Sequence, residues 1–247
     1  MREGILVVKK LPGMTSHDVV ELVRRKLGMQ HIGHGGTLDP MASGVLVLLI
    51  GGATKQQRAV QSHRKWYEAV IRLGIQTDTA DAWGKVLQTS PVPRLIAEHL
   101  VAVLASCVGL LTQVPPVFSA VKVQGRPLYW WARHGKRLTA APRTVEIFTL
   151  ELLELLDDRF RCRIECSAGT YIRTLAETIA ERLGTVGHVS ELVRLAVGPW
   201  GLAQAHEVPW LKSVNIEEIW AAVIPVAEVP RPADGGCVGS AGSPCVC

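Results

Sequence analysis

Apolar and polar residues alternate along two stretches of the chain with the period of two that is typical of a half-buried strand. In residues 65–76, the apolar face carries Tyr67, Ala69, Ile71 and Leu73. In residues 159–169, it carries Phe160, Cys162, Ile164 and Cys166. The runs at residues 5–8 and 45–50 are apolar throughout and predict two buried strands.

Three other stretches show the spacing of helices. Residues 15–28 form an amphipathic pattern with Ser16 as the candidate N-cap. Residues 94–109 form an apolar helical run, and residues 170–184 form a third helix with Thr170 as its candidate N-cap. Strands and helices are mixed without a regular strand–helix–strand rhythm. We therefore expect an α+β fold whose mixed, mostly antiparallel central sheet is flanked by helices and loops.

The composition allows one large domain, because 247 residues with 48% hydrophobic content are enough to bury a sizeable core. The apolar run at residues 45–50 is far too short to cross a bilayer, and the N-terminus shows no signal-peptide cleavage site. We expect a cytoplasmic protein with no membrane partner. From about Pro230 the chain is rich in Gly, Ser, Pro and Cys, so residues 230–247 are expected to be a disordered tail.

The six cysteines predict no metal site. Cys162 and Cys166 fall in a strand pattern, Cys107 falls in a helical run, and the other three belong to the tail. None has the C-x-x-C spacing of a zinc site, so we expect reduced structural thiols and no bound metal.

The charge is compatible with a polyanionic partner but does not establish one, since the net charge is +5 and the sequence pI is about 9.0. The segment VKVQGRPLYWWARHGKRL mixes five cations with Tyr129, Trp130 and Trp131. Cations for phosphates beside flat rings for bases are what looped or single-stranded RNA requires. Taken alone, however, an amphipathic helix with a solvated face explains this segment better.

A single carboxylate, Asp39, stands before Pro40 and shortly after two glycines, Gly35 and Gly36. The proline holds the Asp39 backbone extended, and the glycines permit unusual backbone angles and close approach. Asp-Pro is most often a simple turn. Here the acid lies next to the apolar run at residues 45–50, at the rim of a core where a lone charge is costly, so it requires a cation.

Arg173 is a candidate for that cation. Counted from Thr170, it occupies the third helical position, where a capping box would have Glu or Gln, and its charge opposes the helix dipole. Pairing Arg173 with Asp39 would satisfy both anomalies and keep the acid ionised, as a nucleophile requires. An arginine that reaches into solvent explains the position equally well. Tyr67, on the apolar face of its strand, is either a core residue or a ring that stacks on a base.

Seven motifs follow one another in an order and spacing that chance does not explain. They are KLPGMTSHDVV, GHGGTLDPMASGVL, GGATK, KWYEAVIRLGIQTDTAD, PPVFSAVKVQGRPLYWWARHGK, CSAGTYIRTLA and GHVSELVRLAVG. Through them, residues 4–230 resemble the bacterial TruB family of tRNA pseudouridine(55) synthases. The resemblance implies a pseudouridine synthase fold, with residues 1–229 as the catalytic domain and residues 119–142 as an insertion that grips RNA.

The resemblance also implies a reaction and its residues. Asp39 would attack the flipped uridine or, in the competing account, its ribose, while the base detaches, turns and rejoins through carbon. No cofactor or metal is implied. Arg173 would pair with Asp39, and Tyr67 would stack on the base and take part in proton removal. The RNA-contacting positions would be His34, which nothing in the local sequence buries, with Tyr171, Leu192, Lys122, Arg126 and Arg133.

Three positions depart from the family pattern. Lys10 is separated from Pro12 by Leu11, which leaves the role of Lys10 open, and Val193 replaces an arginine that usually precedes Arg194. About 17 residues follow Pro230, too few for the small C-terminal RNA-binding domain of bacterial relatives, so we expect that domain to be absent.

Four functions remain open. We expect a stand-alone, monomeric enzyme that isomerises the T-loop uridine of tRNA without guide RNA. The alternatives are a tRNA-folding chaperone that binds the T-arm with secondary catalysis, and a guide-RNA-dependent pseudouridine synthase subunit. An unrelated hydrolase with an aspartate nucleophile is less favoured, because no second acid or metal motif accompanies Asp39 in the sequence.

Overall fold

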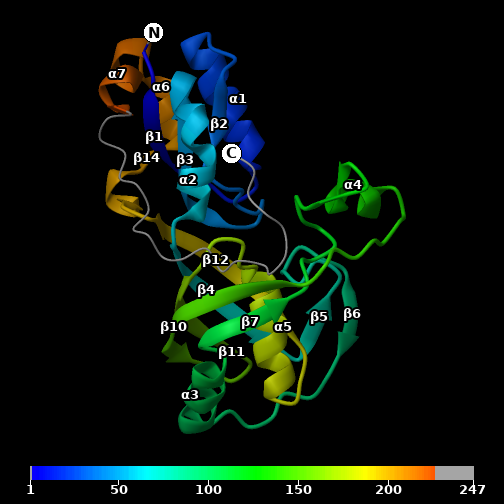
Figure 1. Ribbon diagram of the computed structural model, residues 1–247. Coiled ribbons are helices and arrows are strands. Elements are labelled where there is room, and N and C mark those ends of the chain that lie inside the picture. Colours follow the sequence, from blue (N-terminus) through cyan, green and yellow to red (C-terminus); the bar gives the residue numbers. More distant parts are fainter. Residues whose placement is uncertain (1, 226–247) are drawn as a thin grey trace, which may run out of the picture.

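A mixed sheet of 11 strands runs through the computed structural model, which describes residues 2–225 (Figure 1). Its main path is β14-β1-β3-β12-β4-β11-β10-β7, with β2, β13 and β15 attached to β3, β12 and β1. All pairings are antiparallel except β1 with β14 and β3 with β12. The predicted α+β fold with a mostly antiparallel sheet is confirmed, whereas the tail expected at residues 230–247 lies outside the described residues.

The strands of the main sheet are β1 (Gly4–Lys10), β2 (Ile32–His34), β3 (Ser43–Ile50), β4 (Lys65–Leu73), β7 (Gly109–Gln113), β10 (Arg143–Leu155), β11 (Arg159–Cys166), β12 (Gly187–Val197), β13 (Trp200–Gly201), β14 (His206–Glu207) and β15 (Ile224–Pro225). Two small hairpins are formed by β5 (Ile75–Thr77) with β6 (Val86–Thr89) and by β8 (Lys122–Val123) with β9 (Arg126–Pro127). The α-helices are α1 (Ser16–Leu27), α2 (Gln57–Ser62), α3 (Ala97–Ser106), α4 (Leu128–Arg133), α5 (Ile172–Arg182), α6 (Val208–Ser213) and α7 (Ile216–Ala221). Short 3₁₀ helices are η1 (Gly51–Gln56) and η2 (Leu202–Gln204).

Both N-caps predicted from the sequence are wrong by one residue. The N-cap of α1 is Thr15, whose side chain accepts a hydrogen bond from the Asp18 backbone while the Asp18 carboxylate accepts one from the Thr15 backbone. The N-cap position of α5 is Tyr171. The hydroxyl of Thr170 instead donates to the carbonyl of Ser167, in the turn before the helix. In each case, the hydroxyl that was expected to cap the helix forms its hydrogen bond with another group.

The core is divided between two parts of the sheet. In one part, α3 and α5 pack on strands β4, β10, β11 and β12, where the predicted apolar faces of β4 and β11 are buried. In the other, α1, α6 and α7 pack against β1, β2 and β3 (Figure 1). A third cluster lies under α2 on the opposite face of β1 and β3. Strand β12 pairs with both β3 and β4, so it joins the two parts across one continuous sheet.

Residues 119–142 contain the β8–β9 hairpin and α4, and this insertion projects from the body of the protein (Figure 1). Its helix is only six residues long, shorter than the amphipathic helix expected there. The cations of the insertion lie over its own rings: Arg126 over Trp130 at 5.2 Å and Arg133 over Tyr129 at 5.6 Å. Across residues 2–225, no helix is long and apolar enough to cross a membrane.

Candidate active site

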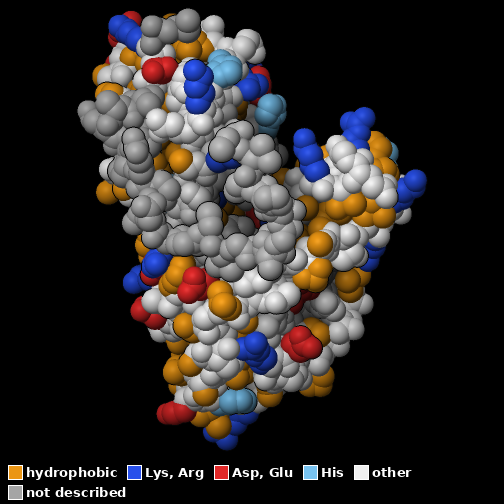
Figure 2. Space-filling model, viewed as in Figure 1, with side chains coloured by type: hydrophobic (Ala, Val, Ile, Leu, Met, Phe, Trp, Pro, Cys, Tyr) orange, Lys and Arg blue, Asp and Glu red, His pale blue; other side chains and the backbone are white. Residues whose placement is uncertain are grey.

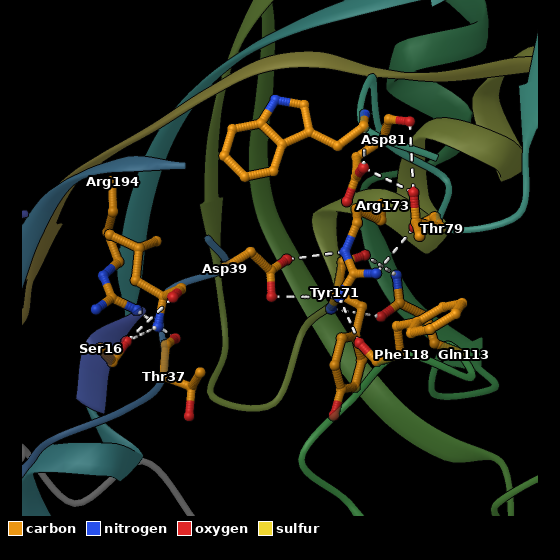
Figure 3. Close-up of polar contacts among 12 residues, drawn as sticks. Ser16, Thr37, Asp39, Thr79, Asp81, Gln113, Phe118, Tyr171, Arg173 and Arg194 are labelled. Atoms are coloured by element: carbon orange, nitrogen blue, oxygen red, sulfur yellow. Dashed lines mark hydrogen bonds and ion pairs between the residues drawn. The ribbon is translucent and has the colours of Figure 1, made fainter. Parts of the chain in front are cut away.

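The loop of residues 36–42 carries Asp39 and is fixed by buried polar side chains from three elements, of which Ser16 and Arg194 are labelled in Figure 3. The Ser16 hydroxyl, at the start of α1, accepts from the Leu38 amide at 2.8 Å and donates to the Leu38 carbonyl at 3.0 Å. Arg194 of β12 donates to the carbonyls of Gly36 and Thr37 at 3.2 and 3.0 Å. These contacts join the loop to both parts of the sheet.

Lys10 is the third of these side chains, and the structure settles the position that the displaced proline left open. Its ammonium group is buried and donates to the carbonyls of Ala42 at 2.6 Å, Met14 at 2.8 Å, Leu11 at 3.0 Å and Pro40 at 3.4 Å. Burial lowers the pKa of Lys10 to about 8, while the negative charge of Asp39 opposes that shift. Through these four carbonyls, Lys10 fixes the backbone of the turn that carries Asp39.

The glycines before Asp39 have different roles. Gly36 has a φ of +134°, with open space where a Cβ would lie, so its backbone conformation favours glycine. Gly35 has no such angle, and its absent side chain makes room for Val60 of α2, which a Cβ would meet at 2.3 Å. The sequence-based expectation that both glycines serve unusual angles is therefore correct for Gly36 alone.

Asp39 and Arg173 form a bidentate ion pair. Arg173 Nε donates to Asp39 Oδ2 at 2.8 Å and Nη2 donates to Oδ1 at 3.2 Å (Figure 3). The remaining donors reach the carbonyls of Thr79 at 2.9 Å and Phe118 at 3.0 Å. The Arg173 side chain is 4% exposed and that of Asp39 is 30% exposed. The cation is thus enclosed by protein while the carboxylate it holds remains accessible.

The start of α5 places Arg173 where it can reach Asp39. Because the helix begins at Ile172, Arg173 is its second residue and not the third that the sequence predicted. The buried Gln113, at the end of β7, fixes the turn before it: its side-chain oxygen accepts from the Tyr171 amide at 2.9 Å and its nitrogen donates to the Tyr171 carbonyl at 3.2 Å. The unfavourable cation near the helix N-terminus is offset by the carboxylate it binds.

A cavity of about 1080 Å³ adjoins this ion pair, and its lining includes Ser16 of α1 and Tyr129 of the insertion. Figure 2 shows a hollow between the α1 part of the molecule and the insertion. The predicted site residues that line it are Asp39, Arg173, Tyr67, His34, Tyr171, Leu192 and Arg133. The predicted RNA contacts Lys122 and Arg126 lie on the exposed β8–β9 hairpin and do not line it. The structure therefore brings together every predicted catalytic residue but separates two of the predicted RNA contacts from them.

His34 is more enclosed than its glycine neighbours suggested. It ends β2, its side chain is half-buried, and its Nδ1 accepts from the Gly36 amide at 3.3 Å. Burial lowers the pKa of His34, and the nearby charge of Arg194 lowers it further. The imidazole is therefore neutral near pH 7 and faces the cavity as a hydrogen-bonding group.

Tyr67 lies in the floor of the cavity on β4, with 8% of its surface exposed. Burial raises the pKa of Tyr67 to about 12, although the positive charge of Arg194 opposes that shift. The side chain is consequently a neutral phenol near pH 7. A ring in this state suits stacking on a base, and any proton that it accepts requires its own proton to be passed on at the same time.

The sequence did not anticipate Asp81, a second acid in the same cavity. Its carboxylate accepts from the Thr79 hydroxyl at 2.7 Å and from the Trp83 amide at 3.0 Å. The motif TDTAD contained this acid, but nothing in its spacing indicated that the turn folds back toward Asp39. Among the described residues, no group of three or more His, Cys, Asp or Glu side chains could hold a metal ion.

The sequence of this chain matches that of a known enzyme family over more than half of its length. Residues 24–172 match the sequence model described as TruB family pseudouridylate synthase (N terminal domain), so the chain is of the pseudouridylate synthase class. The match covers more than half of the 247 residues, and the chain belongs to the TruB family.

Curated relatives extend the similarity over most of the chain. The "tRNA pseudouridine synthase B" of Opitutus terrae is 42% identical over 224 residues, which cover 91% of this chain and 93% of that protein. The protein of the same name from Francisella tularensis subsp. novicida is 41% identical, with coverages of 92% and 75%. Both similarities therefore extend over more than nine tenths of this chain.

Solved structures share the fold. A chain of a Cbf5-Nop10-Gar1 complex matches with a TM-score of 0.69 and 29% identity, covering 91% of this chain. A chain of an H/ACA RNP bound to a substrate RNA containing 2'-deoxyuridine matches with a TM-score of 0.65 and 26% identity, covering 90% of this chain. This protein spans about 60% of the length of those chains.

Proposed function

We propose that the protein isomerises uridine to pseudouridine in the T-loop of tRNA, at position 55, as a stand-alone enzyme. The observation that carries the proposal is the Asp39–Arg173 ion pair, whose accessible carboxylate faces a cavity large enough for a flipped nucleotide. Membership of the TruB family and the names of the curated relatives support the same reaction.

The reaction first requires the uridine to leave the stack of the T-loop, which costs a few kcal/mol. Asp39 then forms a bond to the base or to the ribose while the bond between the base nitrogen and the ribose breaks. The base turns, a carbon–carbon bond to the ribose forms, and the bond to Asp39 breaks. The carbon that joins the ribose loses its proton, and the nitrogen released from the ribose takes one up. Atoms and electrons balance without an oxidant, a reductant or a cofactor, because substrate and product are isomers.

The side chains of the cavity divide this work. Arg173 orients the Asp39 carboxylate and balances its negative charge until Asp39 attacks. The planar guanidinium holds both carboxylate oxygens. Tyr67 provides a face on which the uracil stacks, and its hydroxyl relays the proton that leaves carbon. Tyr171 and Leu192 enclose the nucleotide, and His34 occupies space that the flipped base vacates. Lys122, Arg126 and Arg133 of residues 119–142 hold the RNA arm.

The enzyme is proposed to act as a monomer, because residues of one chain complete the cavity. The likeness to chains of a Cbf5-Nop10-Gar1 complex and of an H/ACA RNP keeps the guide-RNA-dependent subunit as a second candidate. A chaperone that binds the T-arm is the third. Curated relatives at 41–42% identity, named as tRNA enzymes, favour the stand-alone enzyme over both.

Pseudouridine mapping tests the proposal directly. A T-arm transcript and a full tRNA transcript are incubated with the unmodified protein, with Asp39→Asn, and with Asp157→Asn as a matched control at an exposed acid. We expect the protein and the control to convert the T-loop uridine without added guide RNA, and Asp39→Asn to bind but not convert. Conversion that depends on a guide would support the subunit, and binding without any conversion would support the chaperone.

A further inference from the structure

Trp83 is a large apolar side chain in the wall of the cavity, yet it is 60% exposed. It lies in the turn that joins β5 to β6, on the side of the molecule where the insertion projects (Figure 1). Within residues 2–225, its indole has no ring, cation or hydrogen-bond partner. An exposed tryptophan in the wall of a cavity offers a large, flat apolar face to a ligand.

The turn that carries Trp83 is rigid. The Trp83 amide donates to Asp81 Oδ1 at 3.0 Å, and the Gly84 amide donates to the Asp81 carbonyl at 3.2 Å. The Ala82 amide donates to the carbonyl of Val189 in β12 at 3.0 Å, and this bond joins the turn to the main sheet. Because its backbone is fixed, only the side-chain torsions of Trp83 are left to be ordered when a ligand covers it.

A chain of hydrogen bonds connects the Trp83 backbone to Asp39. Asp39 binds Arg173, Arg173 donates to the Thr79 carbonyl at 2.9 Å, and the Thr79 hydroxyl donates to Asp81 Oδ1 at 2.7 Å. That oxygen also receives the Trp83 amide. The backbone from which the indole projects is therefore held in a defined relation to the Asp39 carboxylate.

The cavity has room for more than one nucleotide. Pockets of about 300–1,000 Å³ hold an entire drug-sized ligand, and this cavity measures about 1080 Å³. On the insertion side it is lined by Tyr129, which is 40% exposed, and by Arg133, whose guanidinium lies 5.6 Å from the Tyr129 ring. Exposed rings in a cation-lined cavity suit the bases of a looped RNA, because every base offers a face for stacking.

We propose that Trp83 stacks on a base adjacent to the flipped uridine and so positions the RNA for attack by Asp39. This inference rests on the proposed function, because it takes the T-loop as the substrate. Trp83 is a positioning residue that touches the RNA next to the target and takes no part in bond making. One neighbouring nucleotide is thus held outside the loop stack together with the uridine.

The expected effect is set by the strength of base–aromatic stacking. Alanine substitution of such rings costs about 1–3 kcal/mol per base, which corresponds to a ~5- to 150-fold weaker affinity. Trp83→Ala is expected to weaken binding of the T-arm within that range, and Trp83→Phe to restore most of it. Leu87→Ala is the matched control, because Leu87 is 54% exposed on the same hairpin and does not line the cavity.

A double-mutant cycle with abasic RNA tests the stacking itself. T-arm RNAs with an abasic nucleotide at each position flanking the target uridine are titrated against the unmodified protein, Trp83→Ala, Trp83→Phe and Leu87→Ala. At one position, the abasic change and Trp83→Ala should cost no more together than either does alone. Unchanged affinity of Trp83→Ala, or full additivity at every position, would overturn the inference.

Conversion of the intact T-arm by the unmodified protein is measured in parallel, so that the two proposals fail separately. If the unmodified protein converts the T-arm but Trp83→Ala binds it with unchanged affinity, only the stacking role of Trp83 is overturned. Tight T-arm binding that depends on Trp83, but without conversion, removes only the catalytic function. If the unmodified protein does not bind the T-arm, both proposals are overturned.

Discussion

Replacing Arg173 with lysine tests whether the cavity needs the shape of the guanidinium or only its charge. The guanidinium donates two hydrogen bonds to Asp39 and one to each of the carbonyls of Thr79 and Phe118. A lysine ammonium is a compact charge that cannot hold both carboxylate oxygens in a planar fork. Arg173→Lys therefore keeps a cation beside Asp39 but loses the orientation of the carboxylate.

The size of the effect follows from these contacts. Hydrogen bonds to charged groups contribute about 1.5–3 kcal/mol each, so one lost carboxylate bond slows the reaction by ~10- to 10²-fold. Misplacement of a reacting group by about 1 Å costs a further factor that can reach ~10². We expect the rate of the chemical step in Arg173→Lys to fall by ~10²- to 10³-fold. The affinity for RNA should change by less than about threefold, because the Arg173 side chain is only 4% exposed.

A single-turnover assay with enzyme in excess over T-arm RNA measures the chemical step, and a separate titration measures affinity. Arg182→Lys is the matched control, since Arg182 lies on the same helix and donates to Ser106 away from the cavity. The reasoning is refuted if Arg173→Lys reacts at the unmodified rate. It is also refuted if the loss is confined to affinity, because Arg173 would then act on the RNA and not on Asp39.

Three further predictions concern the residues around the ion pair. Tyr67→Phe should bind T-arm RNA within about threefold but react ~10²- to 10⁴-fold more slowly in single turnover, because the ring remains and the proton relay is lost; an unchanged rate would leave Tyr67 with stacking alone. Ser16→Ala should lower the free energy of unfolding in urea by about 1–3 kcal/mol, because it leaves both backbone groups of Leu38 unpaired; a smaller loss would show that the loop re-forms these bonds. Burial lowers the pKa of Lys65 from 10.5 to about 8, so between those pH values the unfolded chain binds more protons. The stability of the unmodified protein relative to Lys65→Met should therefore rise with pH across that window, by on the order of 3 kcal/mol; a constant difference in urea unfolding would contradict the shift.

The sheet and the ion pair could be predicted because they leave signals in the sequence. The alternation of β4 and β11 indicated which face is buried, and Ile71 and Ile164 are indeed fully buried. Asp39 and Arg173 each broke a local electrostatic rule, one as a lone acid beside an apolar strand and the other as a cation near a helix N-terminus. Two anomalies of opposite charge are most simply resolved by pairing, although they lie 134 residues apart in the chain.

The supports of the Asp39 loop could not be predicted in this way. Lys10 and Arg194 bind backbone carbonyls, which every residue possesses, so their partners leave no pattern in the sequence. The same holds for Arg173, whose contacts with Thr79 and Phe118 depend on where two loops come to lie. The N-caps were misplaced for a related reason. The Ser16 hydroxyl is taken up by Leu38, which leaves the cap of α1 to Thr15, and the Thr170 hydroxyl bonds Ser167, so that α5 begins without a side-chain cap.

The question raised by a lone acid is answered by the charges that surround it. Five cations line the cavity, namely Arg58, Lys65, Arg133, Arg173 and Arg194, against the two acids Asp39 and Asp81. Such a cavity attracts the phosphates of RNA. Loss of the Asp39 charge would make the cavity more positive, so Asp39→Asn should bind T-arm RNA at least as tightly as the unmodified protein while catalysis is lost. Weaker binding by Asp39→Asn would mean that Asp39 contacts the RNA chiefly as a ligand, and the surplus of cations would then need another explanation.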